Sequence, residues 1–183
     1  NYFQSQSAYI RRLTDTFYGL TGKKGVYSVG AIINDISSYR LELTREIFFK
    51  LRNMPYDYTE VENREREFIL TQPLGKAFLV PSEFDWESIE EAHRTFDRLS
   101  GTTPNNRNPN DVIAERVFFR LQKKLDDCKE ITTYVDKFIA HSATPESRSI
   151  QDVNKSAVTF KRLWDAHQII FEVAEFLSVI LFS

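Results

Sequence analysis

Glycine, proline, histidine and cysteine are all scarce in this chain of 183 residues, which has six glycines, six prolines, three histidines and one cysteine. A single cysteine excludes an internal disulfide framework and any site built from clustered cysteines. Few glycines and prolines, together with the lack of any long stretch that alternates apolar and polar residues, predict an all-α chain.

Charge of one sign and long apolar runs are missing as well. The formal net charge is −2, and charges of both signs are interspersed, which argues against a dedicated duplex-DNA binder. The longest apolar run, Ile169 to Phe182, contains Glu172 and Glu175 and is too short to span a bilayer. We therefore expect a cytoplasmic protein that does not cross a membrane.

Several standard site motifs are also absent. The sequence has no glycine-rich phosphate loop, no His-Glu-x-x-His and no Gly-x-Ser-x-Gly. No two histidines are close enough in sequence to suggest shared metal ligands. We expect no metal and no cofactor.

The length fits one domain with a self-sufficient core. Residues 1–5 resemble the remnant of a cleavable expression tag and are left out of the fold prediction. The remaining residues, 6–183, are expected to form a single helical domain. A segment at about 55–108 reads as an insertion of irregular and short-helical structure.

Apolar residues that recur every three or four positions predict four longer helices. Asn108 and Pro109 are expected to open the third, which can bend in its middle, and Ser149 with Asp152 to open the fourth. The four helices are expected at residues 7–20, 27–54, 108–141 and 150–181.

The middle of the chain carries shorter elements. The charged residues 58–72 and the residues from 82 to 100 each read as a helix, the second with Ser82 and Asp85 as a capping pair and Gly101 at its end. Residues 101–110 are rich in turn formers and read as a polar loop.

The last predicted helix carries a wide apolar face. One line of residues alternates steps of four and three, as coiled-coil positions do. Leu163, Ile170 and Leu177 widen the face beside that line, so the helix is expected to be central in the bundle or part of a dimer contact. The line comprises Val153, Ala157, Phe160, Trp164, His167, Phe171, Ala174, Ser178 and Leu181.

Glu130, Tyr134, Lys137 and His141 are spaced by four, three and four residues, so a regular helix would place them in one polar stripe. An imidazole transfers protons near neutral pH, a lysine stabilises phosphate charge, and a tyrosine hydrogen-bonds. Such a set could support attack of a ribose 2′-hydroxyl on its neighbouring phosphate. The alternative is a solvated face, with His141 interacting with the helix dipole.

The two other histidines and the cysteine are expected to have structural roles. His93 and His167 are expected to be hydrogen-bonded core or interface histidines, because each lies between apolar neighbours on a helical face. Cys128 falls at an apolar helical position and is expected in the core.

The stretch YVDKFIAHSATPESR, Tyr134 to Arg148, carries a family resemblance. An amphipathic helix ending in Asp-Lys-x-x-Ala-His-Ser, a short link and an apolar final helix resemble the HEPN superfamily, most closely its abortive-infection AbiU-like branch. The resemblance covers roughly 108–183, with 27–54 as a weaker match. It implies an up-and-down bundle of long antiparallel helices that forms a homodimer with the motif helices near the two-fold axis.

Many proteins of this superfamily are metal-independent endoribonucleases that act as toxins or antiviral effectors, so the resemblance implies RNA and an antitoxin protein as partners. Their signature is an arginine, four to six residues and a histidine, and the two motifs of a dimer form one site. His141 takes the histidine position and Asp136 the polar position after the arginine. Val135 stands where the arginine would be.

Two hypotheses follow from the resemblance. In the first, the homodimer cleaves RNA with His141 as general base or acid, Lys137 and Arg148 as phosphate-binding groups and Tyr134 as an auxiliary group. In the second, the chain is a catalytically silent HEPN-like module for dimerisation or partner binding, and His141 is structural.

Overall fold

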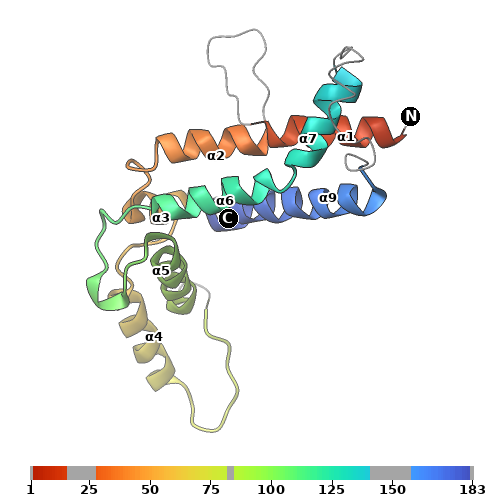
Figure 1. The fold of residues 1–183 in the computed structure, drawn as a ribbon. Helices are drawn as coiled ribbons and strands as arrows, with labels where there is room; N and C mark the ends of the chain where they lie inside the picture. The colour runs from red at the N-terminus through yellow and green to blue at the C-terminus, as the bar shows by residue number, and fades with distance from the viewer. Residues whose placement is uncertain (1, 16–27, 82–84, 141–157, 182–183) are drawn as a thin grey trace. The chain divides into compact units, whose positions relative to one another are not determined.

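The structure, a computed structural model, describes residues 2–15, 28–81, 85–140 and 158–181. Helices dominate these residues, and no strand occurs among them beyond an isolated bridge between Thr44 and Val112. The all-α prediction is confirmed (Figure 1). Contacts divide the described chain into two units, the first formed by residues up to 39 and from 115 to 181, the second by residues 40–114.

The first unit is a bundle in which α1 packs against α7 and α9, and α2 packs against α6 (Figure 1). Two of its α-helices continue into a π-helical turn, η3 and η4. Its elements are α1 (Tyr2–Thr14), α2 (Val29–Ser38), α6 (Glu115–Asp126), α7 (Lys129–Val135), η3 (Asp136–Ala140), α9 (Phe160–Glu175) and η4 (Phe176–Leu181).

Apolar residues from all five α-helices form the core of the first unit. Gly30 allows the start of α2 to lie directly against the end of α1. A Cβ on Gly30 would stand 2.7 Å from the carbonyl oxygen of Asp15, which is closer than real contacts allow. The buried residues include Ile10, Ile33, Phe118, Leu121, Leu125, Ile131, Val135, Leu163, Ala166, Ile170 and Val173.

The second unit contains α3 (Arg45–Leu51), α4 (Thr59–Thr71), α5 (Trp86–Ser100) and the 3-10 turn η2 (Pro104–Asn106). The helices predicted at 58–72 and 82–100 are therefore confirmed as α4 and α5. Its buried apolar residues are Phe48, Phe49, Val61, Ile89, Ala92, Phe96, Leu99 and Ile113.

The ends of α5 follow capping rules. The side chain of Asp85 alone is the N-cap and accepts a bond from the backbone N–H of Ser88. The expected partner, Ser82, lies outside the described residues. Gly101 ends the helix in the left-handed region, at φ 81°, as predicted.

The first predicted helix, 7–20, has the wrong bounds. α1 begins at Tyr2 and ends at Thr14, so it includes residues set aside as a tag remnant. The ring of Phe3 contacts the rings of Tyr134 and Phe160, at centroid distances of 6.3 and 5.6 Å. These residues therefore contribute packing to the first unit.

The second predicted helix, 27–54, is wrong as a single element, because it divides into α2 and α3. α2 ends at Ser38, and Thr44 opens α3 in an extended conformation with its hydroxyl accepting from the backbone N–H of Ile47. The apolar periodicity continues across this break, which is why the sequence suggested one helix.

The third predicted helix, 108–141, starts later than expected and is interrupted. Asn108 does not cap it: its side chain accepts from the backbone N–H of Asn110 within a turn, and α6 begins at Glu115. The chain breaks again between α6 and α7, where the N–H of Cys128 bonds to the carbonyl of Leu125.

The fourth predicted helix, 150–181, is wrong as one continuous helix. Thr159 has an extended conformation and caps α9 through the backbone N–H of Arg162, so the helix begins at Phe160. The proposed capping residues Ser149 and Asp152 lie outside the described residues. The buried side of α9 and η4 is formed by Leu163, Ala166, Ile170, Val173 and Leu177, not by the described members of the predicted coiled-coil line.

Candidate functional site

The predicted polar stripe lies on α7 and on the π-helical turn η3. Tyr134 is in the last turn of α7, and Asp136 and Lys137 open η3. His141 and Arg148 lie outside the described residues, so their predicted roles stay predictions. π-helical turns inside α-helices occur often at functional sites.

Tyr134 belongs to an aromatic cluster. Its ring stands 6.3 Å from that of Phe3 and 5.3 Å from that of Phe138. Glu130, the first member of the stripe, forms an ion pair with Arg162 of α9 at 2.7 Å. The residues of the stripe therefore contact different parts of the first unit. Lys137 follows Asp136 directly on the turn η3.

Asp136 is brought next to an arginine from α1. The Nε of Arg11 lies 2.7 Å from Oδ1 of Asp136, and its Nη1 lies 3.2 Å from Oδ2 of Asp15. The hydrogen bond that Arg11 donates to Asp136 is the main cause of the raised pKa of Arg11. The guanidinium side chain is still 40 % exposed, so it remains accessible to a ligand.

Val135, where the resemblance implied an arginine, is buried, with 2 % of its surface exposed. It packs in the core of the first unit with its neighbour one turn earlier, Ile131. An arginine in this orientation would place its charge in the core, which is unfavourable without partners. In this chain the guanidinium near the motif comes from Arg11 instead.

A pocket of about 460 Å³ opens beside this ion pair, within the size range of small-molecule sites. Five charged residues line it: Arg11, Lys129, Asp15, Asp126 and Asp136. The carboxylates outnumber the cations, so the pocket has a net negative formal charge.

Two amide side chains occupy the side of this pocket formed by α2 and α6. The Nε2 of Gln122 donates to Oδ1 of Asn34, and both residues line the pocket together with the hydroxyls of Thr14 and Thr132. Amides and hydroxyls both donate and accept hydrogen bonds. The pocket can therefore form hydrogen bonds with a polar ligand from several sides.

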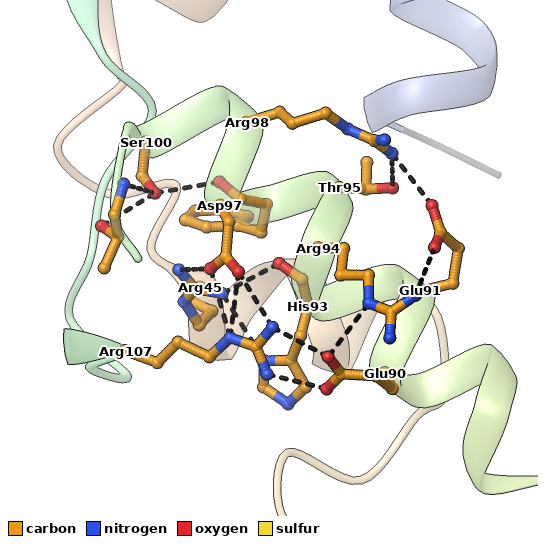
Figure 2. A network of polar contacts seen from close by, with 12 residues as sticks. Arg45, Glu90, Glu91, His93, Arg94, Thr95, Asp97, Arg98, Ser100 and Arg107 are labelled. Atoms are coloured by element: carbon orange, nitrogen blue, oxygen red, sulfur yellow. Dashed lines mark hydrogen bonds and ion pairs between the residues drawn. The ribbon is translucent and has the colours of Figure 1, made fainter. Parts of the chain in front are cut away.

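A second cluster of charged residues, which was not predicted from the sequence, lies within the second unit (Figure 2). Two arginines bind three carboxylates there. Arg45, at the start of α3, has no exposed surface. Its Nη2 lies 2.8 Å from Asp97 and 2.9 Å from Asp111, and its Nη1 donates to the carbonyl of His93 at 3.2 Å.

Arg107 joins the cluster from the polar loop predicted at 101–110. It binds Glu90 through both terminal nitrogens, at 2.7 and 3.1 Å, and Asp97 at 2.9 Å. The loop is thus held against α5 by a nearly buried guanidinium. The Arg107 bonds are the main cause of the low pKa of Glu90, about 2, and they raise the pKa of Arg107.

His93 is a hydrogen-bonded core histidine, as predicted. It is 3 % exposed, and Nε2 lies 2.8 Å from the carbonyl of Tyr56. Burial is the main cause of its lowered pKa. Since Glu90, His93 and Asp97 are spaced by three and four residues, the sequence did carry a signal: two carboxylates on the apolar face of a helix.

Aromatic side chains of α9 are exposed to solvent. Phe160, Trp164 and Phe171 are exposed by 71, 65 and 61 %, and they share one helical face with the half-buried His167 and Ala174. We call these five residues the outer seam. Between Phe160 and Ala174 the predicted coiled-coil line thus lies on the outer side of α9.

Cys128 lies in the core, as predicted, with 1 % of its surface exposed. Burial raises the pKa of its thiol to about 11. Within the described residues, no group of three or more His, Cys, Asp or Glu side chains could hold a metal ion. A search of the same residues found no helix with the length and apolarity to cross a membrane.

Comparison with known proteins yields one partial likeness. A stretch of 107 residues, 57 % of this chain, is 30 % identical to part of the human E3 ubiquitin-protein ligase HECW1. That stretch covers 6 % of the length of HECW1. No family model and no solved structure matches the chain.

Proposed function

We propose that the chain is a HEPN-like protein of prokaryotic defence or toxin type that binds and cleaves RNA beside the turn η3 without a metal. The observation that supports this proposal is the ion pair between Arg11 and Asp136. It supplies a guanidinium next to the motif aspartate, although the preceding motif position holds the buried Val135. A guanidinium binds phosphate oxygens with a fork of parallel N–H donors.

Each residue has a separate role in the proposed reaction. Arg11, helped by Lys137 and Arg148, holds the phosphodiester. His141 takes the proton of the ribose 2′-hydroxyl as its oxygen bonds to phosphorus. The bond from phosphorus to the 5′-oxygen breaks, and the protonated His141 of the second copy gives a proton to the leaving 5′-oxygen. Tyr134 is auxiliary. A homodimer would contribute two such motifs to one composite site.

Carboxylates in the pocket would compete with the phosphates of RNA for Arg11. Arg11 is shared between Asp136 and Asp15, so an incoming phosphate has to replace one of these carboxylates. Asp126 adds a further negative charge to the pocket. Binding is therefore expected to be weak and to weaken further as salt increases.

The test is a ribonuclease assay on a mixed-sequence RNA in excess chelator. Wild type is expected to cleave. His141→Ala is expected to lose at least 100-fold in rate, within the range of general acid–base catalysis, and Arg11→Gln at least tenfold.

Arg12→Gln is the matched control, because Arg12 is an exposed neighbour on the same helix and should leave the rate within twofold. Circular dichroism at equal concentration checks that all variants are folded. Absence of cleavage by wild type, or cleavage that neither His141→Ala nor Arg11→Gln reduces, contradicts the proposal.

The second candidate function is a catalytically silent HEPN-like module for dimerisation or partner binding. Two observations favour it: the carboxylates of the pocket outnumber its cations, and α9 exposes three large aromatic rings. Exposed aromatic patches commonly mark protein contacts. In this case His141→Ala changes thermal stability or self-association instead of RNA cleavage.

The partial likeness to an E3 ubiquitin-protein ligase does not carry that activity to this chain. The matched stretch covers 6 % of the length of HECW1, too little to carry the activity of the whole ligase.

A further inference from the structure

The outer seam of α9 has the spacing of a helix-pairing surface. Phe160, Trp164, His167, Phe171 and Ala174 follow one another by four, three, four and three residues, as the core positions of a coiled coil do. The adjacent face of α9 is already occupied by the core of the first unit. A partner helix could therefore pack on the seam without disturbing the bundle.

We infer that the occupant of the outer seam is α9 of a second copy of this chain, packed antiparallel. In such a pair Trp164 of one copy lies against Ala174 of the other, and His167 lies against Phe171. Large rings thus meet smaller side chains, which allows them to interdigitate. A parallel pair would instead place Trp164 of one copy against Trp164 of the other.

Charges beside the seam are self-complementary only in the antiparallel arrangement. Lys161, Gln168 and Glu175 lie seven residues apart on one edge of the seam, where flanking charges select orientation. With the two-fold axis near Gln168, Lys161 of each copy, which pairs with Asp165 of its own helix at the surface, also lies beside Glu175 of the other copy. In a parallel pair this edge of the two copies would lie on opposite sides of the interface, so Lys161 and Glu175 would not meet.

The seam is sufficient for a weak dimer. An aromatic side chain carries about 150–250 Å², so the three rings, each roughly two-thirds exposed, offer on the order of 300–500 Å² per copy. A standard interface buries about 800 Å² per partner. Reversible association in the micromolar range is expected, and it does not depend on RNA cleavage.

Sedimentation equilibrium of the full chain from about 1 to 500 µM tests this inference. Wild type is expected to dimerise with a dissociation constant on the order of 1–100 µM. Trp164→Glu should weaken the dimer at least tenfold. Phe119→Glu, at a residue of α6 with nearly the same exposure, 64 %, is the matched control and should stay within twofold of wild type.

Charge exchange tests the orientation. Lys161→Glu and Glu175→Lys should each weaken the dimer severalfold, and the double variant should restore it to within twofold of wild type. A chain that is monomeric throughout, a Trp164→Glu variant that dimerises as wild type does, or a double variant no better than either single one overturns the inference. RNA cleavage by the same preparations tests the proposed function separately.

Discussion

Replacing Arg45 by methionine should destabilise the second unit more than any surface substitution. Methionine keeps much of the volume but removes the charge that Asp97 and Asp111 share. Asp97 would keep Arg107 as a partner, whereas Asp111 would lose the only ion pair described for it. Both carboxylates have side chains exposed by less than a fifth, 11 and 17 %, so water replaces the guanidinium poorly.

The expected cost is about 3–5 kcal/mol, the range for removing one partner of a buried ion pair. Arg45→Met also removes the hydrogen bond to the carbonyl of His93 and the contact with the ring of Phe96, 4.8 Å from the guanidinium. The range of about 3–5 kcal/mol already includes both losses. Arg98→Met is the matched control on α5. Arg98 is 68 % exposed and pairs with Glu91 at the surface, so it should cost at most about 1 kcal/mol.

Urea unfolding followed by tryptophan fluorescence measures both costs. Trp86 lies in the second unit, stacked on Tyr58 at 5.9 Å, and Trp164 is the only other tryptophan. A Trp164→Phe background therefore leaves one reporter in the unit that carries the cluster. A loss below about 1 kcal/mol for Arg45→Met, or equal losses for Arg45→Met and Arg98→Met, would refute a stabilising role for the cluster.

Two further predictions concern pH and RNA affinity. The pKa of Glu90 falls from 4.5 to about 2 on folding, so its contribution to stability, about 3 kcal/mol, is present above pH 4.5 and is lost as pH falls towards 2. Urea unfolding in the Trp164→Phe background measures the fall in the free energy of unfolding between pH 6 and pH 3. This fall should be about 2 kcal/mol larger with Glu90 than with Glu90→Gln, and equal falls would contradict the role given to Glu90. Asp136→Asn removes the carboxylate that competes for Arg11 and should tighten RNA binding about two- to fivefold, measured by fluorescence anisotropy at fixed salt. Weaker binding would show that Arg11 needs Asp136 to hold its position.

The sequence predicted helical content well, because apolar periodicity depends only on neighbouring residues. It predicted where α5 ends for the same reason, since Gly101 is a local signal. It failed at the break before α3 and predicted only a bend at the break before α7, because the apolar pattern continues through both. Polar turn bonds, such as those around Thr44, decide these breaks.

Contacts between residues that are far apart in the sequence could not be predicted from the sequence. α9 has two apolar stripes, and only packing against α1 and α6 selects Leu163 and Ile170 as core and leaves Trp164 outside. Asp97 meets Arg45 from 52 residues away. Likewise, nothing local to Asp136 indicates that Arg11 of α1 would stand beside it.

The π-helical turn Asp136–Ala140 changes how spacing near the motif should be interpreted. Such a turn holds close to one residue more than an α-helical turn, since its bonds reach one residue further. Side chains within the turn are therefore rotated relative to the positions that a continued α-helix would give them. Deleting a single residue from Asp136–Ala140 would rotate the side chains that follow within the turn by about a quarter of a turn. The length of this turn, as much as its chemistry, therefore sets which groups can meet around Asp136.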